Sequence, residues 1–469
     1  MLFPTLDFLL FFVAVLALLV PCQRQHELRK LVLTGASYFF YAQWNWHYCL
    51  LLAGSSLLTY AGGLAINAAS RQRTRKLIVG VTVGGHLLLL STFKYLDFLV
   101  GSANHLMHAL GSDRELPFME IILPVGISFF TFHGISYLVD VYRGDVAVCR
   151  RPLDILLYLS FFPQLVAGPI VRAAFFLPQL ARPPAERVPI AEPVLLILGG
   201  LFKKVVIATY LATDLVDPVF FDPSRYRPLD LVLAAYGYAV QIYCDFSAYT
   251  DMAIGFATLL GYRFPINFNQ PYRAQSLREF WQRWHISLSS WLRDYLYKPL
   301  GGSRGGRWFT VRNLMITMLL GGIWHGAAWK FVAWGGLHGA GLAAERFLKP
   351  WSGAWARTRV GKSVAVLIVF HFVCLGWILF RADSFQTVTI YLGAMVSGQG
   401  DEMQVTPFTL ALIVLGLALH AVPRDMPARL ARWAAAMPQW GWGVTAGVGI
   451  AMIDALGPEG VAPFIYFQF

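Results

Sequence analysis

A histidine in the middle of an apolar and aromatic stretch is the residue of this sequence best placed to do chemistry. His325 lies in segment 315–339, MITMLLGGIWHGAAWKFVAWGGLHG, and its neighbours are apolar or aromatic for more than a helical turn on either side. Ionisable groups at membrane depth are costly to hold and mark functional sites by default. An apolar environment favours the neutral imidazole, which is the form that a general base needs. The alternative is a structural histidine that binds a backbone carbonyl.

A second histidine lies in a basic and aromatic segment upstream. His285 belongs to segment 267–302, NFNQPYRAQSLREFWQRWHISLSSWLRDYLYKPLGG, together with Arg278 and Arg283. Guanidinium groups pair bidentately with phosphate, so arginines near a histidine suit an anionic, phosphate-bearing ligand. The alternative is an interfacial helix whose arginines meet lipid headgroups.

Polar side chains also interrupt an apolar run at 241–255, QIYCDFSAYTDMAIG. Asp245, Ser247 and Asp251 stand there inside a predicted span. Polar groups at such depth must be paired within the protein or must line a cavity.

The composition predicts an all-α polytopic membrane protein. Hydrophobic residues make up 57% of the 469 residues and charged residues 14%. The net charge of +12 comes from short clusters between apolar runs, which is typical of cytoplasmic loops and not of nucleic-acid binding. The five cysteines show no paired spacing, and His325 and His338 are thirteen residues apart, so we expect no disulfide and no metal site.

The apolar runs predict about ten spans in one membrane domain, 1–469, with both termini outside. We expect the segment 153–170, interrupted by Pro163, Gly168 and Pro169, to be re-entrant, and 262–312 to lie at the cytoplasmic interface. Segment 315–339 is predicted to form a helical hairpin. The expected spans cover 6–20, 31–52, 53–68, 77–100, 121–141, 194–215, 231–260, 364–380, 409–420 with its flanks, and 440–455.

Six stretches in order resemble the membrane-bound O-acyltransferase (MBOAT) family, in the bacterial branch that acylates extracytoplasmic polysaccharides of the alginate type. They are LPVGISFFTFHGISYLVDVYR, GPIVR, QIYCDFSAYTDMAIG, FWQRWHISLSSWLRDYLYKPLGG, GGIWHG and CLGWILFRADSF. The resemblance covers nearly the whole chain. One departure is His133, which stands where another polar residue, such as glutamine, is expected.

The resemblance implies an MBOAT fold with re-entrant segments around a central funnel, and acetyl-CoA as a co-substrate that arrives from the cytoplasm. It implies His325 as the general base that deprotonates an acceptor hydroxyl, and His285 as the partner that positions the thioester or polarises its carbonyl. Apart from this co-substrate, no cofactor is expected. The expected substrate-binding residues are Trp324, Arg278, Arg283, Asp245, Ser247 and Asp251.

The C-terminal aromatic tail 464–469, FIYFQF, carries a further hypothesis. It resembles the aromatic end of a small accessory peptide of teichoic-acid D-alanylation, in which a tyrosine is thought to receive the acyl group. By analogy Tyr466 takes an acetyl group near His325 and delivers it outside. The alternative is that the tail is an aromatic anchor at the membrane interface.

The function expected from these features is acetyl transfer across the inner (cytoplasmic) membrane for O-acetylation of a polysaccharide. The resemblance implies membrane lipid around the chain and a periplasmic SGNH-hydrolase-like partner that places the acetyl group on the glycan. Transfer of D-alanyl or another acyl group to a cell-wall polymer stays open, as does a lipid acceptor. Because Asp245, Asp251 and His325 could also mark an ion path, a transporter stays open too.

Overall fold

The described part of the chain is helical. The computed structural model describes residues 3–22, 24–183, 190–348, 358–398, 400–423, 425–434, 436–458 and 460. Within these ranges the only β pairing is an isolated bridge between Tyr226 and Glu402. The all-α prediction is therefore confirmed.

The chain forms two compact units. The N-terminal unit comprises residues 1–187 and 260–264, and the C-terminal unit comprises residues 188–259 and 265–469. The predicted interface segment 262–312 thus begins in the first unit and continues in the second. That the whole chain acts as one membrane domain stays a prediction.

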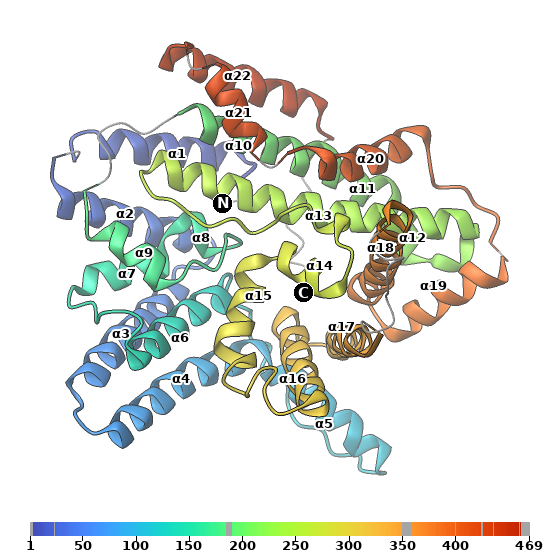
Figure 1. Ribbon diagram of the computed structural model, residues 1–469, viewed down its shortest axis with the longest axis horizontal. Coiled ribbons are helices and arrows are strands. Elements are labelled where there is room, and N and C mark those ends of the chain that lie inside the picture. The colour runs from blue at the N-terminus through green and yellow to red at the C-terminus, as the bar shows by residue number, and fades with distance from the viewer. Residues whose placement is uncertain are drawn as a thin grey trace. The chain divides into compact units, whose positions relative to one another are not determined.

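The N-terminal unit holds nine described helices (Figure 1). They are α1 (Leu6–Leu19), α2 (His26–Ala42), α3 (Tyr48–Ala68), α4 (Gln72–Lys94), α5 (Leu96–Ala109), α6 (Ile127–Arg143), α7 (Pro152–Ser160), α8 (Phe162–Leu165) and α9 (Ala173–Leu180). Small residues allow α3 and α6 to approach closely, since a Cβ on Gly63 would lie 2.7 Å from the Tyr137 ring.

The predicted re-entrant segment is broken where its sequence indicates. Helix α7 ends at Ser160 and α8 begins at Phe162, with Pro163 in its first turn. Gln164 satisfies a carbonyl at the break, because its Nε2 donates to the Tyr158 oxygen at 2.6 Å. His133 of α6 is fully buried nearby, with its ring 5.4 Å from the ring of Tyr158.

The C-terminal unit is built around α13 (Pro228–Leu259), a 32-residue helix that packs against α10, α18, α19 and α20 (Figure 1). Before it lie α10 (Ala191–Phe202), a π-helical turn (Lys203–Ala208), α11 (Thr209–Leu211), a second π-helical turn (Ala212–Val216) and α12 (Asp217–Phe221). After it come α14 (Leu277–Arg283), α15 (Ile286–Leu292), α16 (Arg307–His325), α17 (Trp329–Leu348), α18 (Arg359–Arg381), α19 (Phe385–Ser397), α20 (Pro407–Ala418), α21 (Met426–Trp433) and α22 (Gln439–Leu456).

Four described helices are long and apolar enough to cross a membrane. They are Tyr48–Ala68, Gln72–Lys94, Ala191–Phe221 and Arg359–Arg381, and a fifth span results if Pro407–Ala421 and Met426–Trp433, bent by 78°, count together. Other predicted spans are helices that are too short or too polar for this measure, such as the 14-residue α1. Several apolar spans are thus supported, whereas the number ten stays a prediction.

The structure differs from the hydropathy pattern in four places. The predicted border between spans at residues 52 and 53 is wrong, because the chain turns at 43–47 and α3 then continues through these positions. Residues 121–126 precede α6 without helical structure. The region around His105 and His108, expected as a loop, is helix α5, and α19 was not predicted at all.

Candidate functional site

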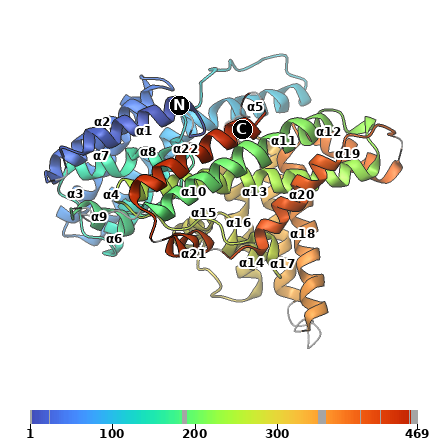
Figure 2. The same ribbon diagram turned by 90° about the horizontal axis from the view of Figure 1, so that it is seen from above.

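A tight helical hairpin holds His325 in place. Helix α16 ends at His325, and α17 begins four residues later at Trp329, so segment 315–339 contains the predicted helical hairpin. The two helices touch through glycines: a Cβ on Gly322 would collide with the Phe331 carbonyl oxygen, and one on Gly335 with that of Met318. Close backbone contact of this kind requires small residues. Figure 2 shows α18 alongside α17.

Aromatic rings surround the imidazole of His325. The ring centroids of Trp324, Trp334 and Phe380 lie 5.1, 5.0 and 5.4 Å from it, each nearly edge to face. His325 itself is 5% exposed. These three rings, which we call the aromatic enclosure, come from α16, α17 and α18. The predicted apolar surroundings of His325 are therefore present in the fold.

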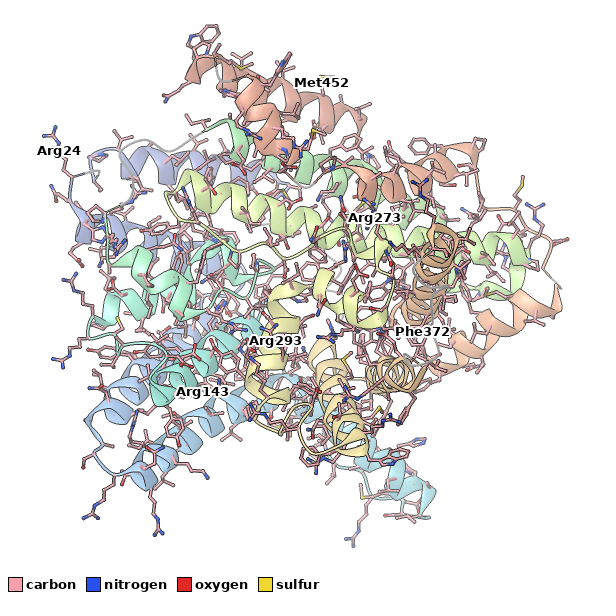
Figure 3. The ribbon with its side chains drawn as sticks, viewed as in Figure 1. Arg24, Arg143, Arg273, Arg293, Phe372 and Met452 are labelled. Atoms are coloured by element: carbon pink, nitrogen blue, oxygen red, sulfur yellow. The ribbon has the colours of Figure 1, made fainter. Side chains whose placement is uncertain are left out.

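His338 is a buried histidine of α17, one helical turn after Trp334 in the sequence. Its ring lies 4.7 Å from that of Trp334 and 5.6 Å from that of Phe372 on α18. Phe372 is labelled in Figure 3. A Cβ on Gly376 would lie 2.9 Å from its Nε2 atom. His338 thus joins the packing between α17 and α18.

His285 occupies the turn between α14 and α15. Its backbone has φ of +42°, a left-handed conformation that is unusual for a residue with a side chain. The imidazole is fully buried, with its ring 4.6 Å from that of Phe246 and 6.0 Å from that of Trp324. Trp324 therefore contacts both His285 and His325, and the two predicted catalytic histidines of this unit flank one indole.

Hydrogen bonds fix the histidine turn. The Asn267 Oδ1 atom lies 3.1 Å from His285 Nδ1, and it accepts from Ser287 N at 3.0 Å and from Ser287 Oγ at 2.8 Å. The Ile286 amide donates to the Asn267 carbonyl oxygen at 2.8 Å. Burial lowers the pKa of His285, which lies outside the candidate spans, to about 3. The ring is therefore neutral at physiological pH. Sequence reasoning missed Asn267, although it opens the segment that contains His285.

The two predicted phosphate-binding arginines differ in their surroundings. Arg283 pairs with Glu279 through two contacts of 2.9 and 2.7 Å, and it also donates to the Asn269 carbonyl oxygen at 3.2 Å. The Arg278 side chain, in contrast, is exposed at the start of α14. Arg278 is thus the more accessible cation for an anionic ligand.

The polar side chains of α13 are paired with lysines of the first π-helical turn. Lys203 Nζ contacts Ser247 Oγ at 2.8 Å and Asp251 Oδ2 at 2.5 Å, and Lys204 Nζ lies 2.7 Å from Asp245 Oδ1. The lysines were missed, although two adjacent lysines inside the apolar run 194–215 were the available signal. Internal pairing was one of the two possibilities that the sequence left open.

Two further expectations concern the C-terminal tail and a metal site. Tyr466 and the tail 464–469 lie outside the described residues. Within the described ranges, no group of three or more His, Cys, Asp or Glu side chains has the arrangement of a metal site.

The chain has clear relatives. A family model described as MBOAT, membrane-bound O-acyltransferase family, matches residues 150–382. The chain is 44% identical to "Probable alginate O-acetylase AlgI" of Pseudomonas aeruginosa over 79% of this chain and 70% of that protein, and 37% identical to the protein of the same name from Pseudomonas putida over 94% of both. It is 36% identical to "Peptidoglycan O-acetyltransferase" of Helicobacter pylori over 79% of this chain and 74% of that protein. With these identities over most of its length, the chain belongs to the membrane-bound O-acyltransferase family and is an enzyme of that family.

Proposed function

We propose that this chain transfers an acetyl group from cytoplasmic acetyl-CoA across the inner membrane for O-acetylation of an extracytoplasmic polysaccharide of the alginate type, around a central funnel. The observation that carries the proposal is the buried His325 in its aromatic enclosure, within a chain related to acetylating enzymes. The three O-acetylating relatives are named after alginate or peptidoglycan, which supports a glycan acceptor over a lipid one.

The chemistry needs few groups, because a thioester is already activated. The acceptor oxygen attacks the acetyl carbon while His325 takes the proton of the acceptor hydroxyl. The carbon–sulfur bond then breaks, and the protonated His325 returns this proton to the CoA thiolate. General-base assistance of this kind contributes about 10² to 10⁴-fold to a rate. The aromatic enclosure excludes water around the imidazole, which favours transfer over hydrolysis.

The donor needs a cationic contact for its phosphates. The exposed Arg278 is the first candidate, and Arg283 is the second because Glu279 already pairs with it. Trp324 contributes an apolar surface between the two histidines. Asp245, Ser247 and Asp251 are paired with Lys203 and Lys204, and Phe246, which lies between the first two in sequence, contacts His285.

Delivery to the glycan involves a periplasmic partner of the SGNH-hydrolase-like kind. Transfer to it follows one of two routes, directly from the thioester or through an acetyl ester on Tyr466. In the second route the tyrosine hydroxyl is the acceptor that His325 deprotonates.

The test is thioester consumption by the purified full chain in detergent with acetyl-CoA. We expect turnover in wild type and a loss of about 10² to 10⁴-fold in His325→Ala. The matched control is His105→Ala, which removes an exposed histidine of α5. Equal turnover of wild type and His325→Ala would contradict the proposal. Absence of turnover with acetyl and D-alanyl thioesters alike would favour the transporter.

Peptide mass spectrometry of the same samples separates the two routes. An acetyl group on the tail peptide of wild type, absent from Tyr466→Phe and His325→Ala, supports the tyrosine route. Turnover that requires His325 but leaves no acetyl group on the tail supports direct transfer. Consumption of a D-alanyl thioester in place of acetyl-CoA would reassign the donor.

A further inference from the structure

The orientation of the Asn267 side chain follows from its neighbours. Its Oδ1 atom lies 3.0 Å from the backbone nitrogen of Ser287, and a backbone N–H can only donate. The atom facing Ser287 must therefore be the amide oxygen. The other end of the amide agrees with this orientation, because Nδ2 donates to Thr250 Oγ1 at 3.4 Å.

This oxygen determines where the proton sits on His285. Asn267 Oδ1 is also 3.1 Å from His285 Nδ1, and an amide oxygen can only accept. The Ser287 hydroxyl also lies 3.5 Å from Nδ1, but its hydrogen goes to Asn267 Oδ1, which is much closer at 2.8 Å. Nδ1 therefore carries the hydrogen that faces Asn267. In a neutral imidazole the second nitrogen, Nε2, then has no hydrogen and presents a lone pair.

The lone pair of His285 is left available inside the protein. Nε2 is buried and has no hydrogen-bond partner among the residues that the structure describes. The neighbouring rings of Phe246, Phe268 and Trp324 carry no charge, and His325 lies beyond Trp324. A buried acceptor without a donor costs about 1–3 kcal/mol, so a fully buried one in a candidate site points to a donor that arrives with the substrate.

We infer that Asn267 is a positioning residue that holds His285 in its Nδ1–H form, so that Nε2 accepts a hydrogen bond from a substrate N–H or O–H. The inference rests on the proposed function and narrows it. A nitrogen without a hydrogen cannot donate to the thioester carbonyl. His285 can therefore position the substrate, but its Nε2 atom cannot polarise the thioester carbonyl. The donor is either an amide N–H of the acyl-CoA chain or a hydroxyl of the acceptor, which are the donors that the two substrates offer.

A direct test reads the hydrogen position on the ring. In a long-range ¹H–¹⁵N correlation spectrum of the full chain labelled with ¹⁵N-histidine, the signals of His285 are assigned by their loss in His285→Gln. We expect the pattern of the Nδ1–H form in wild type. The pattern of the Nε2–H form would overturn the inference, while the proposed function, tested by His325→Ala, would stand.

A kinetic test separates positioning from a general structural role. Asn267→Leu removes the acceptor of the Nδ1 hydrogen, and we expect about a tenfold loss of kcat/KM, the equivalent of about 1.4 kcal/mol. Asn267→Asp keeps an oxygen at this place, so activity should return to within about threefold of wild type at high pH. Its carboxylate also stabilises the imidazolium, and protonation removes the lone pair, so the acid limb of the pH profile should move to higher pH.

The split between kinetic constants identifies the donor group. A rise in KM for acetyl-CoA alone assigns the hydrogen bond to an amide of the acyl-CoA chain. A fall in transfer to the acceptor, with KM for acetyl-CoA unchanged, assigns it to the acceptor hydroxyl. The matched control is Ser289→Ala, since Ser289 Oγ donates to the Trp284 carbonyl oxygen and does not touch Asn267. Asn267→Leu and Asn267→Asp with the same loss and the wild-type pH profile would overturn the inference.

Discussion

Replacing Gly335 by alanine tests whether the α16–α17 hairpin positions His325. A Cβ at this position would collide with the Met318 carbonyl oxygen and would lie 3.0 Å from the Met318 carbonyl carbon and 3.1 Å from Leu319 Cα. All three are backbone atoms, so no side-chain rotation relieves the contact and α17 must move away from α16. We estimate a movement of about 1 Å from the usual contact distance between carbon atoms of about 3.5–4.0 Å.

The expected result has two parts. Overpacking should lower the free energy of unfolding by about 1–3 kcal/mol, partly offset by the gain of about 1 kcal/mol from alanine in a helix. A displacement of about 1 Å between His325 on α16 and Trp334 on α17 should lower kcat by up to about 10²-fold. The assays are thermal unfolding in detergent and acetyl-CoA turnover.

A matched control stands next to this glycine. A Cβ on Gly336 meets only the Leu319 Cδ2 atom, at 3.7 Å, an ordinary contact. Gly336→Ala should therefore keep its activity and unfold at the wild-type temperature or above it. The reasoning is refuted if Gly335→Ala and Gly336→Ala cannot be distinguished in both assays.

Three further predictions follow from contacts in the C-terminal unit. Lys204→Met leaves the buried Asp245 carboxylate without its lysine, so the free energy of unfolding, measured by thermal unfolding, should fall by about 3–5 kcal/mol. The double variant with Asp245→Leu should recover most of this stability. A Lys204→Met variant as stable as wild type would contradict the prediction. Arg278→Ala should raise KM for acetyl-CoA about tenfold and Arg283→Ala less. Equal KM values for acetyl-CoA and its dephospho form in wild type would exclude a contact with the 3′-phosphate, and an unchanged KM in Arg278→Ala would contradict the prediction. The pKa of His285 is about 3 in the folded protein and about 6.5 in an unfolded chain, so the unfolded state binds more protons between these values and stability should fall as pH drops from 6.5 towards 3. His285→Gln should reduce the slope of stability against pH by up to about 1.4 kcal/mol per pH unit. An unchanged slope would be evidence against the lowered pKa of His285.

The sequence predicted those parts of the fold that follow from local pattern. The helical hairpin that turns just after His325, the broken segment at Pro163 and the long helix with Asp245 each follow from hydropathy or from proline within one stretch. The turn at 43–47 was missed because Trp44 and Trp46 stand among its polar residues and because none of its residues is Asp, Glu, Lys or Arg, so the hydropathy pattern shows no clear break there.

Pairing between distant residues could not be predicted in this way. Nothing in the local pattern indicates that Lys203 and Lys204 reach the acidic residues of α13, some forty positions later. The same holds for Asn267, which binds His285 only because the chain folds back through a left-handed residue. Hydropathy predicts which residues lie inside but not which of them meet.

The π-helical turns before α13 make the orientation of the following helix depend on the number of residues in these turns. A π turn closes its hydrogen bonds over five residues where an α turn closes them over four, so each of the turns Lys203–Ala208 and Ala212–Val216 accommodates an additional residue. One residue corresponds to a rotation of about 100° about a helix axis. A single-residue deletion within the first turn would therefore act as a twist, rotating Thr209–Phe221 relative to α10. We therefore expect a substitution on the surface of this helix to disturb the fold less than the loss of a single residue from it.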